Sequence, residues 1–474
     1  MISFIKEMDG ESLEDSLVID IQSKLKSNGL TPLRKLKDNV EINYSFSRTN
    51  THLYINWDEK ALEVDDRNEK YFEIRYVLSK EIASCAQKFN FENVYFQSNL
   101  DSKLRNFEIS LATDITSLFS DALYTELSKK IFFFSKHLTE NDYEQTLRMM
   151  SSERNARKWV NENPDELTSI EIGTRLKKFA SNHDCEYIEL GDSEIKEKGL
   201  NLLYQVGKAS KLSPPRLFIL TKNMKKGEKP LTLVGKAITF DSGGINVKPH
   251  ELFVNCMKND MGGGALASNL FMAMVESGYD KPLALVIPSC ENLVDGESMK
   301  PGSIIKSFKG TDVIIEHTDA EGRLILADGM AYAQSLFTPS LTVLFATLTT
   351  AALRQFTSYY TPVHFADSTF KEKLTRHAIT FGENFTFWNR LNLFREANDK
   401  KGIGLTNIGS LNSHASMGGG SNVAAHFLKH FCVGPYIHFD IFASGWNWSG
   451  DYPGASYGAT GAGFYSILKT LKEY

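Results

Sequence analysis

Residues 312–345 read DVIIEHTDAEGRLILADGMAYAQSLFTPSLTVLF, and this stretch decides the fold class. Asp312–Glu316 and Leu341–Phe345 are short apolar runs, typical of buried strands. Leu324–Leu336 lies between them and has the length and apolar spacing of a helix. A strand, a helix and a second strand in this order predict a crossover unit whose two strands run parallel in one sheet.

The same alternation continues towards the N-terminus. Further strands are expected at Glu186–Leu190, Arg216–Leu220, Leu231–Thr239 and Leu283–Ile287, and further helices at Met149–Asn163, Glu171–Ala180 and Ala265–Glu276. This order predicts an α/β fold with a mainly parallel or mixed central sheet and helices on its faces. In such sheets, ligands bind in the loops at the carboxyl ends of the strands.

The composition divides the chain into two parts. A chain of 474 residues is long enough for two or three domains. Only 2 of its 33 glycines lie in residues 1–150, which predicts a domain boundary near residue 150. We expect a smaller N-terminal α/β domain, residues 1–150, used for assembly or access, and a larger α/β domain, residues 151–474, that carries the chemistry. Within the smaller domain, strands are expected at Tyr71–Leu78 and Asn93–Gln97, and a helix at Leu118–Lys130.

Charge and apolar patterning argue against several classes of protein. The formal net charge of −5 argues against nucleic-acid binding through bulk positive charge. The most apolar stretch, Leu341–Leu353, is shorter than the roughly 20 residues that a bilayer-spanning helix needs. The N-terminus lacks the pattern of a secretory signal peptide. The five cysteines are scattered without a CxxC pair, as is typical of a reducing compartment. We therefore expect a cytoplasmic protein with no membrane contact.

Two glycine-flanked loops contain the residues that could take part in catalysis or metal binding. One follows the predicted strand Asp312–Glu316 and contains Asp319, Glu321 and Arg323 at alternate positions. In an extended backbone, these three side chains point to one side. The loop precedes the predicted helix, so the two carboxylates and the arginine are expected at the carboxyl end of a sheet strand, where ligands bind in this class of fold.

The other loop, Val234–Lys248 with the segment that follows it, adds Asp241 and Asp260. Four neighbouring carboxylates carry more charge than one lysine or arginine can offset, so the pattern predicts two divalent cations bridged by carboxylates. Oxygen-rich ligation suits Mg²⁺ or Mn²⁺, and Zn²⁺ also accepts carboxylates. The alternative is an acidic surface with solvated ion pairs.

These motifs resemble those of the leucyl aminopeptidase family (M17), a family of dinuclear metallopeptidases. Thr318–Leu324, TDAEGRL, is similar to the family signature NTDAEGRL. The other matching motifs are Gly235-Lys236, Phe240-Asp-Ser-Gly-Gly244, Asp260-Met-Gly-Gly263, Asp295–Gly302, His438–Ile441 and Gly458–Gly461. The resemblance covers residues 150–474, approximately, and is weak or absent before them.

The resemblance implies a set of five metal ligands: Lys236, Asp241, Asp260, Asp319 and Glu321. Asp241 and Glu321 would bridge the two ions, which would be Zn²⁺ or Mn²⁺, or else Mg²⁺ or Co²⁺. Asp260 and Lys236 would complete one site, and Asp319 the other. A lysine ligand must be neutral, which burial beside two cations favours. The alternative for Lys236 is a salt bridge to Asp241.

The resemblance also implies two catalytic residues. Lys248 would polarise the scissile carbonyl, and Arg323 would hold a bicarbonate ion that carries a proton. The alternatives are a surface lysine ahead of Pro249 and an arginine in a structural ion pair. His317 stands where the family usually has Asn. We expect His317 to orient groups around the metals rather than to bind one.

The segment Ala346–Leu353 is similar to the family sequence ATLTGA, which lines the pocket for the first side chain of the substrate. Thr347, Leu348 and Thr350 would form one wall, and Met257 another. Thr350 replaces a glycine of the family. If its side chain faces the pocket, the pocket is shallower or more polar and favours small or polar first residues; if it points into the scaffold, the preference is unchanged.

Together these features predict a cytoplasmic metalloaminopeptidase that removes N-terminal residues from peptides with two metal ions. The resemblance further implies a homohexamer. Two alternatives stay open. One is a peptidase-like, DNA-binding regulator, for which a complete ligand set would have no purpose. The other is a different dinuclear hydrolase, such as a dipeptidase acting on Cys-Gly.

Overall fold

The computed structural model describes residues 2–4, 16–22, 34–36, 40–46, 50–57, 71–72, 75–76, 78–80, 82–83, 93–98, 105–120, 129–135, 140–249, 251–388, 391–409, 419–448, 452, 454, 458–461 and 463–474. The chain forms two compact units. Unit 1 comprises Met1–Ser151, Thr375–Asn384 and Ser449–Tyr457; unit 2 comprises Ser152–Leu374, Phe385–Trp448 and Gly458–Tyr474. Two later segments therefore belong to unit 1, which the composition did not indicate.

Unit 1 contains a seven-stranded sheet of order β1-β7-β6-β2-β5-β4-β3. The neighbours from β1 to β5 pair in parallel, and β4 and β3 pair antiparallel. The strands are β1 Ile2–Phe4, β2 Ser16–Gln22, β3 Arg34–Leu36, β4 Val40–Phe46, β5 Asn50–Trp57, β6 Asn93–Ser98 and β7 Lys130–Ser135. The strand expected at Asn93–Gln97 is confirmed by β6. The unit also contains the buried helix α2, Arg105–Leu118.

Two predictions within unit 1 are wrong. The expected strand Tyr71–Leu78 is helical at each of its described positions. Tyr71, Arg75, Leu78 and Ile82 are buried at intervals of three or four residues, which is the helical period. The aromatic content of this stretch favoured a strand, but its buried residues have the spacing of a helix. The expected helix Leu118–Lys130 is also wrong at its described ends, because α2 ends at Leu118 and β7 begins at Lys130; residues 121–128 lie outside the described part.

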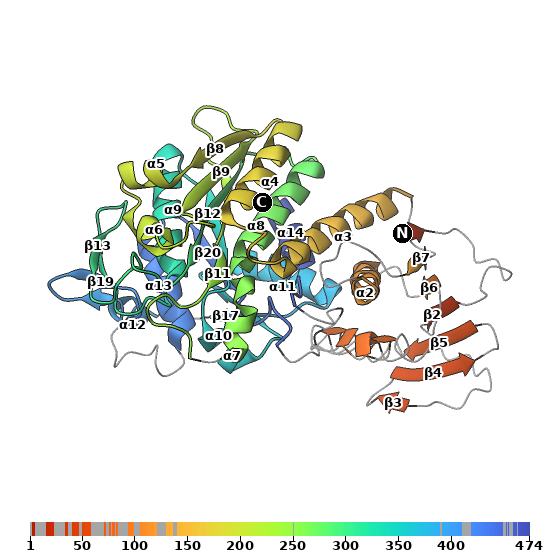
Figure 1. Cartoon of the computed structure of the whole chain (residues 1–474). Coiled ribbons are helices and arrows are strands. Elements are labelled where there is room, and N and C mark those ends of the chain that lie inside the picture. Colours follow the sequence, from red (N-terminus) through yellow and green to blue (C-terminus); the bar gives the residue numbers. More distant parts are fainter. Residues whose placement is uncertain are drawn as a thin grey trace. The chain divides into compact units, whose positions relative to one another are not determined.

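Unit 2 is built on a nine-stranded mixed sheet of order β17-β16-β20-β15-β10-β12-β9-β8, with β11 also pairing with β12 (Figure 1). Its central strands β12, β10, β15 and β20 are parallel, and the antiparallel pairs lie towards both edges. The strands are β8 Glu186–Leu190, β9 Arg216–Lys222, β10 Leu231–Gly235, β11 Ala237–Asp241, β12 Leu283–Asn292, β15 Leu341–Ala346, β16 Thr361–His364, β17 Phe385–Trp388 and β20 Tyr436–Asp440.

A second, four-stranded sheet of unit 2 has the order β13-β14-β19-β18. Its strands are β13 Ile304–Lys306, β14 Asp312–Ile314, β18 Asp399–Lys400 and β19 Gly404–Thr406. The strand expected at Asp312–Glu316 is therefore present but shorter, and it leads directly into the predicted acidic loop.

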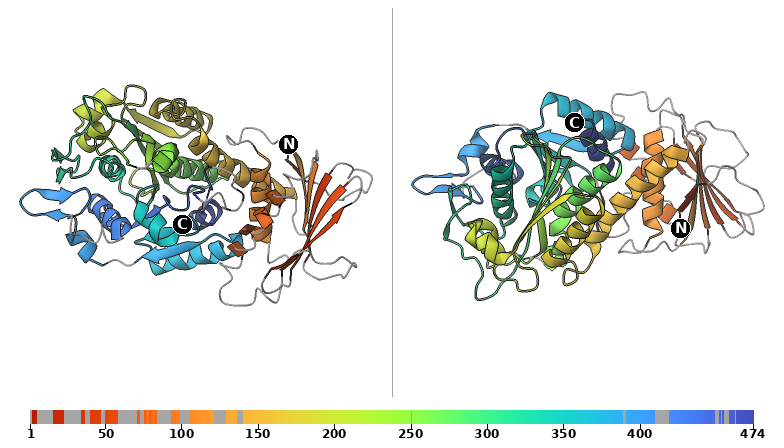
Figure 2. Two further views of the ribbon diagram at one scale, coloured as in Figure 1. Left: turned by 60° about the horizontal axis from the view of Figure 1, so that its bottom comes forward. Right: turned by 90° about the horizontal axis from the view of Figure 1, so that it is seen from above.

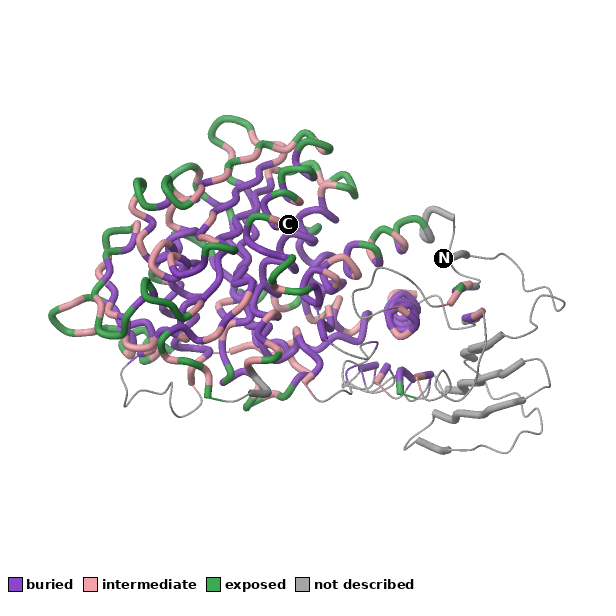
Figure 3. The backbone as a smooth tube through the Cα atoms, viewed as in Figure 1, coloured by how far each residue is buried: buried purple, intermediate pink, exposed green. Residues whose placement is uncertain are grey.

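Helices lie on both faces of the nine-stranded sheet (Figure 2). α6, α9 and α13 share one apolar core with the sheet, and α4 packs on α8 through Phe179 and Phe271. Figure 3 shows buried residues concentrated along the central strands and these helices. The helices with residues in unit 2 are α3 Glu140–Asn161, α4 Ser169–Asn182, α5 Asp192–Glu197, α6 Asn201–Gly207, α7 Glu251–Cys256, the 3₁₀ helix η4 Met257–Met261, α8 Gly262–Glu276, α9 Gly322–Leu336, α10 Thr350–Phe356, α11 Ser368–Phe381, α12 Leu393–Glu396, α13 Gly420–Phe431 and α14 Phe464–Lys472. Of these, α3 and α11 also have residues in unit 1.

The α/β fold with a mixed central sheet is confirmed, and most of the helices and strands expected in residues 151–474 occur with small shifts at their ends. Two differ more: the helix expected at Met149–Asn163 begins at Glu140, and the strand expected at Leu283–Ile287 continues to Asn292. One prediction was too simple: Leu231–Thr239 is not one strand. It breaks at Lys236, and β10 and β11 continue on either side. None of the helices in the described part of the chain is long and apolar enough to cross a bilayer.

Candidate active site

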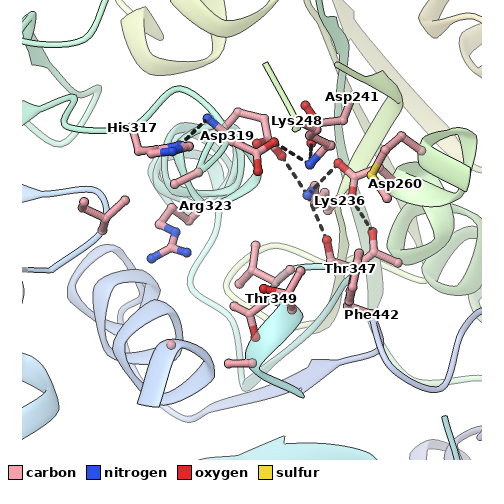
Figure 4. Close-up of a pocket in the computed structure, with 18 of the residues that line it drawn as sticks. Lys236, Asp241, Lys248, Asp260, His317, Asp319, Arg323, Thr347, Thr349 and Phe442 are labelled. Carbon is pink, nitrogen blue, oxygen red and sulfur yellow. Dashed lines mark hydrogen bonds and ion pairs between the residues drawn. The ribbon is translucent and has the colours of Figure 1, made fainter. Parts of the chain in front are cut away.

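A cavity of about 480 Å³ opens in unit 2 (Figure 4). Every residue that the sequence analysis assigned to the site lines it. These residues are Lys236, Asp241, Lys248, Met257, Asp260, His317, Asp319, Glu321, Arg323, Thr347, Leu348 and Thr350. The structure therefore brings the whole predicted set together, while the role of each residue stays a prediction.

The charged side chains come from strand ends and from the segments that follow them. Lys236 lies between β10 and β11, and Asp241 is the last residue of β11. Asp260 lies in η4, and Asp319 and Glu321 lie between β14 and α9. Three segments that are separate in the sequence thus meet at one place, as expected for loops at the ends of sheet strands.

Lys236 is buried within one group of charges. Its Nζ is 2.8 Å from Asp260 Oδ2 and 2.8 Å from Glu321 Oε1. Its side chain packs over Gly322, where an added Cβ would lie 2.4 Å from Lys236 Cε, so the start of α9 requires glycine. Burial alone would lower the pKa of Lys236, but Asp260, Glu321 and Asp241 outweigh it and raise the pKa. The pairing with Asp260 and Glu321 replaces the salt bridge to Asp241 considered above.

Lys248 forms a second charge group with Asp241 and Asp319. Its Nζ is 2.8 Å from Asp241 Oδ2 and also contacts Asp319 Oδ1. Only 14% of the Lys248 side chain is exposed, so it is not the solvated surface lysine of the alternative interpretation. Burial would lower its pKa, but Asp241 and Asp319 outweigh burial and raise it. The ammonium group is therefore held at the cavity by two carboxylates.

Asp241 is fixed by hydrogen bonds on its other oxygen. Oδ1 accepts from the main-chain N–H of Gly243 at 2.9 Å and from Asn292 Nδ2 at 2.7 Å. Gly243 has a φ of +92°, and an added Cβ would lie 2.5 Å from Asn246 O, so this turn requires glycine. Asn292 ends β12, the strand beside β11. The sequence analysis missed Asn292, which lies five residues beyond the predicted end of the strand at Ile287.

The carboxylates crowd one another. Asp241, Asp319 and Glu321 each offer an oxygen, and these atoms lie within 4.8 Å of one another. Burial raises the pKa of Glu321, but Lys236 and Lys248 outweigh it and lower the pKa to about 2. Burial, followed by the Asp241 charge, raises the pKa of Asp319 to about 8. The surroundings therefore lower the pKa of Glu321 and raise the pKa of its neighbour Asp319.

The residues present fit two divalent cations. The four carboxylates carry twice the charge of the two lysines, and Asp241, Asp260 and Glu321 are buried. Glu321 Oε2 is buried and accepts no hydrogen bond from the part of the chain that the structure describes. Densely placed carboxylate oxygens are the donors that Mn²⁺ and Mg²⁺ prefer and that Zn²⁺ accepts, and a neutral Lys236 would add a nitrogen donor.

Arg323 lies in the first turn of α9 and is 7% exposed. Within the described ranges, no ion pair or hydrogen bond joins its guanidinium to another residue, and Nε is buried without a partner. Burial lowers its pKa to about 10, although Glu321 and Asp440 act to raise it. A buried arginine without a partner is costly, so the geometry favours a guanidinium available to a small anion over a structural ion pair.

His317 lies at the cavity and is half-buried. Its Nδ1 is 3.2 Å from the main-chain N of Asp319. Burial and then the Lys248 charge lower the pKa of His317, which favours the neutral ring.

Another part of the cavity is an uncharged wall, formed by Met257, Thr347, Leu348, Thr350 and Phe442. Arg354, one turn along α10 from Thr350, also lines the cavity. Thr350 begins α10 and is exposed on the cavity rather than buried in the scaffold. The sequence analysis missed Phe442, which follows β20 and is buried. A large ring at this position reduces the room available to a substrate side chain.

Thr347 connects the uncharged wall to the charges. Its hydroxyl donates to Asp260 Oδ1 at 3.0 Å, and its carbonyl oxygen accepts from Lys236 Nζ at 2.9 Å (Figure 4). Thr347 therefore holds two of the predicted metal ligands in place, in addition to lining the cavity.

Asp440 holds the main chain of the uncharged wall through hydrogen bonds. The sequence analysis gave it no role. It ends β20 and is fully buried. Oδ1 accepts from the main-chain N–H groups of Leu348 and Thr349 at 3.2 and 3.3 Å. Oδ2 accepts from the hydroxyls of Thr349 and Ser421 at 2.6 and 2.7 Å. A carboxylate at the end of an apolar strand was the signal in the sequence.

Comparisons with known proteins agree with this arrangement. The family model "Cytosol aminopeptidase family, catalytic domain" matches residues 154–468. The probable cytosol aminopeptidase of Cenarchaeum symbiosum is 32% identical over 329 residues, 67% of this chain and 64% of the relative. That of Geobacter sp. strain M21 is 34% identical over 306 residues, 64% of this chain and 60% of the relative. The chain thus spans less than two thirds of the length of these relatives.

Two solved structures share the fold. Leucyl aminopeptidase from Leishmania major, in complex with actinonin, matches with a TM-score of 0.84 and 18% identity over 100% of this chain and 94% of that one. The bottromycin maturation enzyme BotP, in complex with Mn, matches with a TM-score of 0.77 and 23% identity over 97% of this chain and 99% of that one. At these identities the likeness concerns the fold. The chain belongs to the cytosol aminopeptidase family, as its motifs predicted.

Proposed function

We propose that this protein is a metal-dependent aminopeptidase that removes the N-terminal residue of peptides. The observation that carries the proposal is the cavity in which four carboxylates and two lysines converge beside an uncharged wall. Membership of the cytosol aminopeptidase family supports the same activity.

The ligand set proposed for two cations is Lys236, Asp241, Asp260, Asp319 and Glu321. When bound there, the cations would polarise the scissile carbonyl and lower the pKa of the attacking water. Mn²⁺ is the first ion to test, because BotP was solved with Mn; Zn²⁺, Co²⁺ and Mg²⁺ follow.

Three features of the chain would act on the substrate. The Lys248 ammonium would stabilise the negative charge that develops on the carbonyl oxygen. Arg323 would hold a bicarbonate ion and so keep a proton carrier beside the leaving amine. The uncharged wall would receive the side chain of the first residue, with Thr350 and Phe442 restricting its size.

The test is a panel of aminoacyl amides, with their N-acetylated forms as controls, on metal-stripped protein to which each cation is returned separately. We expect hydrolysis only of substrates with a free amine and only with a divalent cation. Cleavage of acetylated substrates at equal rates would contradict an aminopeptidase.

Adding the dipeptide Cys-Gly and a longer peptide to the panel separates the two alternatives. A Cys-Gly dipeptidase would hydrolyse dipeptides but not longer peptides or aminoacyl amides. A DNA-binding regulator without catalysis would hydrolyse nothing with any cation. The homohexamer and the cytoplasmic location implied by the family resemblance remain part of this proposal; the mass of the protein in solution tests the first.

A further inference from the structure

His317 has no role in the reaction described so far, yet it is held firmly at the cavity. Its carbonyl oxygen accepts from Asn407 Nδ2 at 2.7 Å. Asn407 Oδ1 in turn accepts from the main-chain N–H of Glu316 at 2.9 Å. The backbone that carries the imidazole is therefore fixed by a side chain that follows β19.

The hydrogen bond to Asp319 shows which ring nitrogen of His317 carries the proton. The main-chain N–H of Asp319 points to Nδ1 at 3.2 Å (Figure 4). Because an N–H group can only donate, Nδ1 is the acceptor and the proton of the neutral ring lies on Nε2. No side chain or main chain of the described residues hydrogen-bonds Nε2. The ring therefore offers one free donor to a ligand in the cavity.

The same contact explains what His317 shares with an asparagine. An Asn side chain commonly accepts the N–H two residues further on through Oδ1, and this forms a local turn. Nδ1 of His317 makes that turn here. The amide nitrogen of an Asn in this conformation would take the place of ring carbon Cδ2, so it would not reach the position of Nε2. His317 keeps the turn and adds a donor further from the backbone.

The position of His317 indicates which part of a peptide would meet this donor. Figure 4 shows His317 to the left of the charged cluster, beside Asp319, and Thr347 and Phe442 below the cluster. With the first side chain against the uncharged wall and the scissile carbonyl at the charges, the residues after the scissile bond would extend away from the wall, towards His317. The first hydrogen-bond acceptor in that direction is the carbonyl oxygen of the second residue.

We propose that His317 is a specificity-determining residue whose Nε2–H donates to the carbonyl oxygen of the second residue of the substrate. This inference rests on the proposed aminopeptidase activity. It identifies the preferred substrate class as peptides, in contrast to amino-acid derivatives whose leaving group lacks a carbonyl.

The experiment compares kcat/KM for two substrates with the same first residue, Ala-Ala-NH₂ and alanine β-naphthylamide. The second has no acceptor beyond the scissile bond. His317→Asn keeps the turn and removes the donor. We expect the ratio of peptide to naphthylamide to fall roughly 3- to 10-fold, the effect of one neutral hydrogen bond. His430→Asn, on the exposed end of α13, is the matched control and should leave the ratio unchanged.

The outcomes are separable. An equal loss for both substrates would show that His317 serves only the turn, and an unchanged ratio would show that Nε2 does not touch the substrate; either overturns the inference. Loss of bound cation from His317→Asn would make His317 a metal ligand and would also overturn it. If the native protein with its cations hydrolysed neither substrate, the proposed function itself would fail, whatever the variant did.

Discussion

The two parts of the cavity are built differently. In the charged part, Lys236 and Lys248 each contact two carboxylates, and most of these groups are buried. In the uncharged wall, Met257 is buried but Thr350 is exposed, and the main chain is held from behind by Asp440.

Thr347 is the wall residue that contacts the charged part, through Asp260 and Lys236. Among the described residues, Thr350 has no such contact, so a change at Thr350 leaves the arrangement of charges intact. Chemistry and selectivity are therefore separable at Thr350.

This separation predicts two kinds of variant. Changes in the charged part should reduce the turnover of every substrate by a similar factor. Changes in the wall should alter the order in which substrates are preferred.

The largest effect is expected for Glu321→Gln. The substitution removes one charge from the residue proposed to bridge both cations, and kcat/KM should fall by more than roughly 10³-fold, the upper end of the range for one oxyanion donor. The loss should be the same for alanyl and leucyl substrates. Glu297→Gln, at an exposed loop position, is the control. A variant that kept both cations and most of its kcat would show that Glu321 is not a bridge.

A smaller loss is expected for Lys248→Ala. Its ammonium is proposed to act where charge develops, so kcat should fall on the order of 10²–10³ with little change in KM. Lys306→Ala, with a side chain that is 66% exposed, should behave like the native protein. An effect mainly on KM would instead assign Lys248 to ground-state binding.

Asp440→Asn tests the connection between the two parts. Asn cannot accept all the hydrogen bonds from Leu348, Thr349 and Ser421, so the wall should shift. A small displacement of a positioned group lowers kcat/KM, here on the order of 10-fold, and the ratio of leucyl to alanyl substrates should change as well. Asp312→Asn, whose side chain at the start of β14 is 40% exposed, is the control. A uniform loss with an unchanged ratio would place Asp440 with the charged part.

The smallest effect is expected for Thr350→Gly. Removing the side chain from the cavity wall should favour leucyl over alanyl substrates by about 1 kcal/mol, about fivefold, the lower end for one methylene-sized difference. The kcat/KM ratio for the two substrates measures it. An unchanged ratio would mean that Thr350 does not meet the substrate.

The same comparison shows what could be predicted from the sequence. Asp319, Glu321 and Arg323 are close together in the chain, so a local motif placed them correctly at the cavity. Phe442 lines the cavity, and Asn292 contacts Asp241, only because β20 and β12 lie beside strands that are distant in the sequence. Single-strand patterns contain no information on that pairing, and these residues were therefore missed.

In unit 1, by contrast, the sequence predicts little of the structure. No motif marks residues 1–150, and the predicted strand Tyr71–Leu78 is helical at its described positions. The structural likeness to the Leishmania enzyme nevertheless covers 100% of this chain. A fold tolerates replacement of its surface and loop residues as long as the apolar spacing persists, whereas a charge cluster does not tolerate replacement of its members.

The most direct test of the account is the number of Mn²⁺ ions that the native chain binds, measured by titration of metal-stripped protein together with aminopeptidase activity. The account predicts two ions per chain, no activity without them and recovery of activity as they bind, with Glu321→Gln failing to hold both. Full activity in protein confirmed to contain no metal would contradict it.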